Sequence, residues 1–435
     1  MADFEATVEE RGPVRRVLSV TVSAERVARE FDRAYRRLGQ RVRVPGFRPG
    51  KVPRRVLEMR YGDQVREEVV SELIEATCAE AIKEQGLDVV TSPRLIQHEL
   101  DEQNRLHFEA MLDVRPVFEL KPYKGLAAER RVVRVSEEDV DKALASLRER
   151  FAILETEEDR VNVAQGDVIV ADLEAFCDGQ PLAKGTGQGV QIEVGSGRLP
   201  EQLEKQLVGV TRGIRTPILV RFEHDHPDPD LAGKLVRFDV TVREIKNKIL
   251  PALDDEFAAE VGIEGCQTLA DLRAKIREDL ERREQADADR RMRNEVLAAL
   301  VEAHEFEVPE ALVEDQLVRM LRDMGVTEVP EDKVGEVRQA LEPAATRQVR
   351  AGFILDAIAD AEGIEVAEDE LREAIKRQLA AAGSQIEAVQ AYYRRPGAVA
   401  ALRRDLRRDK ALDRVVELAT RRDVEVDRSQ VADTR

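Results

Sequence analysis

A stretch of basic residues, 33–60, carries the side chains best suited to binding an anionic partner. It holds ten Lys or Arg residues and a single acid, Glu58, in a chain whose formal net charge is −18. Arg donates paired hydrogen bonds to phosphate and carboxylate groups, so such a cluster favours contact with a polyanion. Phe47 and Arg48 lie near its middle, and we interpret them as the tip of a docking loop. The alternative is that Phe47 folds back as a small plug and that the charges form a solvated face.

Turns and helices are expected to present this tip. Pro45-Gly46 and Pro49-Gly50 are turn-forming pairs. Helical patterns flank them at 23–37 and 53–85, and the second pattern is predicted to break near Tyr61-Gly62.

Strand-forming segments accompany these helices. They are 3–22, read as two strands around a Gly12-Pro13 turn, 88–99 and 104–115. Strands and helices in this order predict an α+β domain over 1–115, with the basic loop at one end.

Residues 116–161 are predicted to connect domains and to contain a helix of their own. Ser136 and Asp139 form a capping pattern at its start. Its apolar stripe consists of Val140, Leu144 and Leu147. A stripe of this kind is expected to pack on another domain, so the segment is not a free linker.

Residues 162–248 change character, because strand patterns and glycines replace helical spacing. The candidate strands are 166–172, 191–194, 213–220 and 234–243. One short helix is expected near 200–207, and Gly185-x-Gly187-x-Gly189 is predicted to be a flexible turn. His224 and His226 lie in a Pro-broken polar loop without an established zinc spacing, so no metal site is predicted.

Residues 249–435 are predicted to form an almost wholly helical C-terminal body. The expected helices run from Thr268 to about Ala303 and over 309–324, 331–360, 367–382 and 397–421. Scattered apolar residues on 309–324 are candidates for binding unfolded chains: Leu312, Val313, Leu317, Val318, Met320 and Met324. Adaptable Met side chains would suit a broad specificity. The alternative is an ordinary bundle core, which is what an apolar helix stripe usually forms.

Composition excludes several classes of protein. At 435 residues the chain is too long for one compact core. Its three cysteines, Cys78, Cys177 and Cys266, predict no disulfide framework and favour a reducing compartment.

No Ser-His-Asp, Cys-His, HExxH or Walker pattern supports a hydrolase or an ATP-driven machine, and no cofactor is predicted. Neither a signal peptide nor a membrane span is predicted, so we expect a cytoplasmic protein rather than a secreted periplasmic one.

The basic loop resembles the ribosome-docking signature of the trigger factor family. The matching motif is Gly46-Phe47-Arg48-x-Gly50-Lys51-x-Pro53, followed by Arg60-Tyr61-Gly62. The resemblance covers essentially the whole chain. It implies an ATP-independent chaperone that docks at the ribosomal exit site, holds newly synthesised chains open and assists their folding and export.

The resemblance also implies partners and roles. Gly46, Phe47, Arg48, Gly50, Lys51 and Pro53 would contact an exit-site ribosomal protein and rRNA. The third tip residue is Pro49, so one expected charge is absent and Lys51 or Arg54 would have to replace it. The C-terminal helices would form the body and arms of a client cavity. Neither DNA nor a membrane is implied as a partner, and the sequence leaves open whether the free protein forms a homodimer.

The middle domain resembles the FKBP-type peptidyl-prolyl isomerase domain that trigger factors carry. The resemblance rests on Gly166-Asp167, Asp178-Gly179, Gly195-x-Gly197-Arg198, Gly209 and Leu231-x-Gly233-Lys234. It implies rotamase chemistry, in which a dry aromatic cup lowers the roughly 20 kcal/mol barrier to amide rotation. The cup positions fall on Asp172, Leu173, Leu182, Val190, Leu203, Phe222 and His226. Most of them are not aromatic here, so the fold is expected with weak or lost activity.

Two other functions are compatible with parts of the sequence. A freestanding prolyl isomerase would use its other domains only to recruit substrate, but the cup is depleted while the docking loop is largely intact. An RNA-binding regulator would need basic and aromatic residues beyond a single loop.

Overall fold

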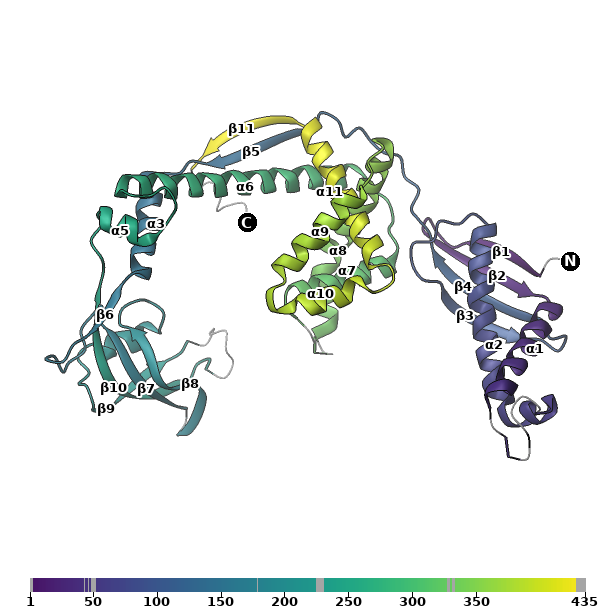
Figure 1. Cartoon of the computed structure of the whole chain (residues 1–435), viewed down its shortest axis with the longest axis horizontal. Coiled ribbons are helices and arrows are strands. Elements are labelled where there is room, and N and C mark those ends of the chain that lie inside the picture. The colour runs from purple at the N-terminus through teal and green to yellow at the C-terminus, as the bar shows by residue number, and fades with distance from the viewer. Residues whose placement is uncertain are drawn as a thin grey trace. The chain divides into compact units, whose positions relative to one another are not determined.

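The computed structural model describes residues 3–42, 44–45, 47, 52–177, 179–223, 231–326, 329–330 and 333–427 (Figure 1). The chain divides into two compact units, Met1–Arg131 with Asp289–Val424, and Val132–Ala288 with Glu425–Arg435. An N-terminal α/β region, a β-rich middle region and a helical C-terminal part are all present. The predicted multidomain fold class is therefore confirmed.

A four-stranded antiparallel sheet underlies the N-terminal domain, in the order β1-β2-β4-β3. The elements are β1 (Phe4–Glu10), β2 (Arg15–Val22), α1 (Ala24–Arg41), α2 (Arg54–Glu84), β3 (Arg94–Leu100) and β4 (Leu106–Asp113). The two helices cover one face of the sheet (Figure 1), where Leu18 and Phe108 are buried. Ser23 caps α1, since its Oγ accepts a hydrogen bond from the Arg26 N–H at 3.4 Å.

Helix α2 runs without interruption through Gly62, so the predicted break near Tyr61-Gly62 is wrong. A glycine in a helix interior costs about 1 kcal/mol relative to alanine. Buried side chains on both sides of it, including Leu57, Val65 and Leu73, pack into one core and outweigh that cost. The long helix therefore extends from the end of the basic loop across the whole domain.

The segment after this domain contains β5 (Ala127–Val133) and α3 (Glu137–Arg150). The capping pattern is confirmed, because the Ser136 N–H donates to the Asp139 carboxylate at 3.0 Å and the Asp139 N–H donates to Ser136 Oγ at 3.2 Å. Leu144 of α3 packs with residues of α5 (Asp255–Val261) and α6 (Leu269–Ala303), so its apolar stripe is a packing face, with its partners in the same compact unit. Strand β5 pairs with β11 (Thr420–Val426), a pairing that the sequence did not indicate.

The middle domain is built on a five-stranded sheet, ordered β6-β10-β7-β8 with β9 also paired to β10. Its elements are β6 (Ile153–Thr156), β7 (Val168–Cys177), β8 (Gln180–Glu193), α4 (Glu201–Leu207), β9 (Arg215–Arg221) and β10 (Leu235–Ile249). The glycines at 185, 187 and 189 lie inside β8 and do not form a separate turn. The β7–β8 register shifts beside them, and Gly185 and Gly189 have φ of 84° and 62°, which glycine adopts without strain.

The helical part contains every long helix that the sequence predicts. Besides α6, its elements are α7 (Glu310–Asp323), α8 (Val334–Ala361), α9 (Glu368–Ala381), the 3-10 turn η2 (Gly383–Gln385), α10 (Ile386–Tyr393) and α11 (Ala398–Leu418). Helix α10 and strand β11 were not predicted. Ile354 of α8, Leu412 of α11 and Leu300 of α6 share one core. Within the described part of the chain, no helix is both long and apolar enough to span a membrane.

Candidate docking tip, isomerase cup and client surface

The loop between α1 and α2 is anchored by a buried apolar residue just before its tip. Val44 is 3% exposed in the domain core, and its C=O accepts a hydrogen bond from the Phe47 N–H at 3.1 Å. The Phe47 residue is 40% exposed, which does not fit a buried plug. Of the other predicted docking residues, Pro53 directly precedes α2, whereas Gly46, Arg48, Gly50 and Lys51 lie outside the described residues.

Part of the basic charge holds the helical hairpin together. Arg54 forms ion pairs with Asp32 of α1 and with Glu58, and its guanidinium lies over the Tyr35 ring at 5.2 Å. The hydrogen bond to Glu58 raises the pKa of Arg54 above its ordinary value. Arg37 of α1 pairs with an acid of α2 at 2.9 Å. Arg54 is thus committed to the base of the hairpin, which leaves Lys51 as the candidate for the missing tip charge.

Other basic residues near the tip are available to a partner. Arg36, Arg41, Arg55 and Arg60 are exposed, and none of them forms an ion pair with another described residue. Their charges are therefore not cancelled locally, as far as the described chain shows. An exposed aromatic ring beside unpaired guanidinium groups can stack on or pack against a partner and bind its anionic groups.

Most of the isomerase-cup positions meet in the core of the middle domain. Leu173 and Leu203 are buried there, and Leu182, Val190 and Phe222 pack against the same cluster. His226 lies outside the described residues. Among the described cup positions Phe222 supplies the only aromatic ring, so the cup is largely an aliphatic core rather than an open aromatic site.

Asp172, the remaining cup position, is held at two points. Its carboxylate accepts hydrogen bonds from the Gly189 N–H at 2.9 Å and from Arg243 Nε at 2.7 Å. These contacts, the backbone bond first, hold the pKa of Asp172 below its ordinary value. The group is therefore an anchored carboxylate that ties β7 to β8 and β10.

The candidate client-binding residues of α7 divide into two sets. Val313 and Leu317 are buried against Ala345 of α8, as the bundle-core alternative expects. Val318 and Met324 are 54% and 66% exposed. Leu312 and Met320 are half-buried, and Met320 packs beside the core.

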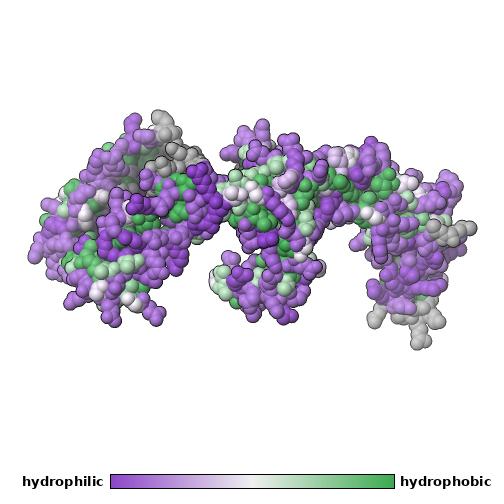
Figure 2. All heavy atoms as spheres, turned by 90° about the horizontal axis from the view of Figure 1, so that it is seen from above, coloured by the Kyte–Doolittle hydropathy of each residue, from purple (hydrophilic) through white to green (hydrophobic). Residues whose placement is uncertain are grey.

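A small apolar groove of about 180 Å³ opens beside the exposed set, between α7 and the start of α8. It is lined by Glu314, Leu317, Val318, Leu321, Val329, Val334, Val337 and Arg338. Val334 is exposed, and Arg338 lies 3.4 Å from the Glu314 carboxylate at the edge of the groove. On the face seen in Figure 2, apolar patches of the molecule are small and separated by hydrophilic residues.

Comparison with known proteins identifies the family. A family model for the bacterial trigger factor protein matches residues 4–147, and one for the trigger factor C-terminus matches residues 268–417. The trigger factor of Anaeromyxobacter dehalogenans is 36% identical over 423 residues, which cover 95% of this chain and 98% of that protein. The chain belongs to the trigger factor family.

A second relative agrees with this assignment. The trigger factor of Geobacillus kaustophilus is 34% identical over 414 residues, covering 92% of this chain and 96% of that protein. A solved structure described as "Promiscuous Substrate Recognition in Folding and Assembly Activities of the Trigger Factor Chaperone" covers 95% of this chain and 99% of that one, at 22% identity and a TM-score of 0.48. Trigger factors are ribosome-associated folding chaperones, and this chain is therefore a folding chaperone rather than a freestanding isomerase.

Sequence reasoning missed two features of this trigger factor. It counted every basic residue of 33–60 toward docking, although Arg37 and Arg54 are ion-paired within the domain. It also missed a groove between α2 and β3, whose apolar residues come from α2, β3 and β4. Two adjacent hydrophobic residues of β3, Leu95 and Ile96, offered a signal, because only one of them can face the core in a regular strand.

Proposed function

We propose that this trigger factor docks at the ribosomal exit site through the α1–α2 tip and holds emerging chains without ATP. The observation that carries the docking proposal is the exposed Phe47 ring on the loop between α1 and α2. The helix ends that flank this loop carry Arg36, Arg41 and Arg55, which form no ion pair with another described residue. RNA offers phosphates to the guanidinium groups, and a ribosomal protein or a base offers an apolar face to the ring. Arg48 and Lys51 would add to this surface by their sequence position.

Ribosome co-sedimentation at several salt concentrations tests the docking. The variant Phe47→Ala/Arg48→Ala/Lys51→Ala should pellet with ribosomes less than wild type does. The slope of the logarithm of its binding constant against the logarithm of salt concentration should also be shallower by up to about two, because two cations are lost. The matched control is Arg29→Ala/Arg33→Ala, which removes two arginines of α1 that are already paired to acids within the domain. Equal loss in both variants, or in neither, would contradict the tip assignment.

The second part of the proposal is that clients bind along α7 and the start of α8. Val318, Met324 and Val334 expose apolar surface next to the small groove, while charged residues separate such patches and favour solubility. Weak, dispersed apolar contacts would retain many different unfolded chains.

Suppression of aggregation tests this surface. The full-length variant Val318→Ser/Met324→Ser should suppress light scattering by a refolding client less effectively than wild type. Val117→Ser is the matched control, because Val117 is an exposed apolar residue outside α7 and α8. Ribosome pelleting of both variants should stay normal. Undiminished suppression by the α7 variant would refute the assignment.

For the middle domain we propose an FKBP-type isomerase of weak activity. Five of the described cup positions belong to one cluster, but Leu173 and Leu203 are buried in it among mainly aliphatic residues. A proline-limited refolding assay with the full-length protein should therefore show little acceleration. Acceleration comparable to that of an ordinary FKBP enzyme would show that an aromatic lining is not required.

A further inference from the structure

A wide groove lies between α2 and β3 of the N-terminal domain. Its volume is about 900 Å³, near the upper end of the range of ligand-binding pockets. Helix α2 packs on β2 and β4, whereas six of the seven residues of β3 are exposed. The outer strand of the sheet therefore projects beyond the helix that covers its neighbours.

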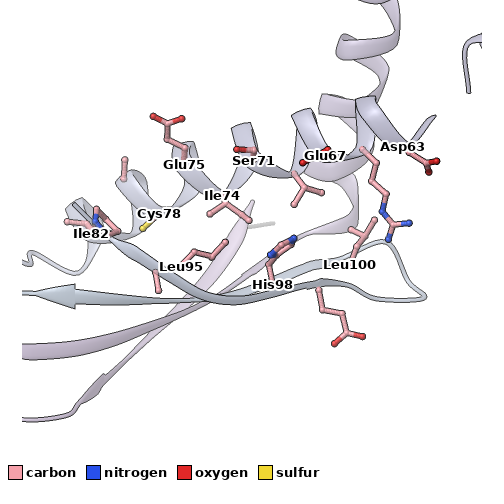
Figure 3. A pocket seen from close by; sticks show the side chains of 16 residues that line it. Asp63, Glu67, Ser71, Ile74, Glu75, Cys78, Ile82, Leu95, His98 and Leu100 are labelled. Atoms are coloured by element: carbon pink, nitrogen blue, oxygen red, sulfur yellow. The ribbon is translucent and has the colours of Figure 1, made fainter. Parts of the chain in front are cut away.

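A β-bulge in β3 places both Leu95 and His98 on the side of the strand that faces this groove. The β3–β4 register shifts between Leu95 and Gln97. Because of this extra residue, Leu95 and His98 lie opposite Ala110 and Phe108 of β4, which face the helices. Figure 3 shows Leu95 and His98 facing the same space as Ile74 and Cys78 of α2.

The floor of the groove is apolar, and its edges are acidic. Leu95 is 42% exposed although it faces the helix layer, so the space above it is not filled by the domain itself. The charged residues that line the groove are Asp63, Glu67, Glu75, Glu99 and Arg66. None of these five forms an ion pair with another described residue. Four carboxylates against one guanidinium leave an unneutralised negative potential around an apolar surface.

The edge of β3 offers a further means of recognition. In the sheet order β1-β2-β4-β3, this strand pairs with β4 and, among the described residues, with no strand on its other side. Unpaired backbone groups of an edge strand can hydrogen-bond an extended peptide, while neighbouring pockets accept its side chains. An anionic partner such as RNA or an acidic membrane surface is disfavoured by the acidic edges.

We propose that the α2–β3 groove binds an extended, unfolded polypeptide segment whose apolar side chains are flanked by Lys or Arg. The proposal rests on the client-holding function, and it adds to α7 and α8 a second client site on the domain that carries the docking tip. The apolar residues of the segment contact Ile74, Cys78 and Leu95. Its basic residues lie beside Glu67 and Glu75.

Photocross-linking to the full-length protein tests the site. The probe is a short peptide of Leu, Phe and Lys with one photoreactive phenylalanine, and the comparison peptide carries Glu in place of Lys. The Lys peptide should cross-link to residues 63–82 and 93–100, and the Glu peptide should not. Cross-links confined to α7 and α8 would overturn the inference while supporting the client surface there. Cross-links absent from the whole chain, together with failure to suppress aggregation, would instead overturn the proposed function.

Charge reversal provides the quantitative test. Glu67→Lys/Glu75→Lys should raise the dissociation constant of the Lys peptide about tenfold at low salt, because two attractive contacts become repulsive. Glu68→Lys/Glu84→Lys is the matched control, with the same net charge change on exposed positions of α2 that do not line the groove. An equal rise of the dissociation constant in both variants would mean that only the net charge matters, and would refute the proposal that the peptide binds in this groove.

An exposed apolar position tests the floor of the groove. Leu95→Asp should abolish the cross-links to 93–100 with an unchanged melting temperature, because Leu95 is exposed before the substitution. Ribosome pelleting should be retained, which shows that the domain is folded. Unchanged cross-linking in this variant would contradict the proposal.

Discussion

Replacement of Phe47 by alanine measures how much the ring contributes to ribosome docking. Phe47 is 40% exposed, and a phenylalanine side chain presents about 200 Å² when fully exposed, so binding can bury at most about 80 Å² more. At about 25 cal/mol per Å², this area corresponds to about 2 kcal/mol of binding free energy. Phe47→Ala should therefore raise the dissociation constant for ribosomes up to about 30-fold.

The assay is a titration of ribosomes with fluorescently labelled protein at fixed salt. Phe47→Leu should retain much of the affinity, since it keeps an apolar side chain, and Val117→Ala should bind as wild type does. The salt dependence of Phe47→Ala should equal that of wild type, because no charge is removed. A change of less than about twofold for Phe47→Ala would show that the ring is not buried on docking. A changed salt slope would show that the loop itself had rearranged.

Three further predictions concern stability. Arg408→Met should lower the free energy of unfolding by about 2 kcal/mol in urea titrations, because it removes the two hydrogen bonds of 2.8 and 2.7 Å to the buried Asp356 carboxylate, which keeps Arg115 at 3.6 Å as an ion-pair partner. Leu144→Ala should cost about 3 kcal/mol by opening a cavity between α3 and α6, measured in the same way. The pKa of Glu362 is lowered from an ordinary 4.5 to about 2, and the hydrogen bond from Lys124 is the largest cause. This carboxylate therefore stabilises the fold above pH 4.5 and loses its effect as the pH falls toward 2, so the stability difference between wild type and Glu362→Gln should shrink over that range.

Local signals in the sequence predicted local structure. The capping box at Ser136 and Asp139 involves residues three apart, and it marks the start of α3 correctly. The break predicted at Gly62 was wrong because core packing on both sides of the glycine, which local propensity does not include, decides whether a helix continues. Pairing between β5 and β11 involves distant segments and has no local signature.

In the candidate sites, too, the sequence predicted what depends on neighbouring residues and missed what depends on distant ones. The position of Phe47 in an exposed loop could be predicted from turn-forming pairs around it, and its exposure agrees. The ion-pairing role of Arg54 could not be predicted, because its partner Asp32 lies on the preceding helix. On α7 the helical period placed the apolar residues on a face, but only the position of α8 determines that Val313 is buried and Val318 is exposed.

The pairing of β5 with β11 has a consequence for the synthesis of this chaperone. The two strands lie far apart in the sequence, and β11 ends only shortly before the C-terminus. At a synthesis rate of about 5–20 residues per second, β5 waits on the order of tens of seconds before its partner exists. During that interval the edge of β5 is open, so a folding chaperone itself passes through a stage with an unpaired strand edge.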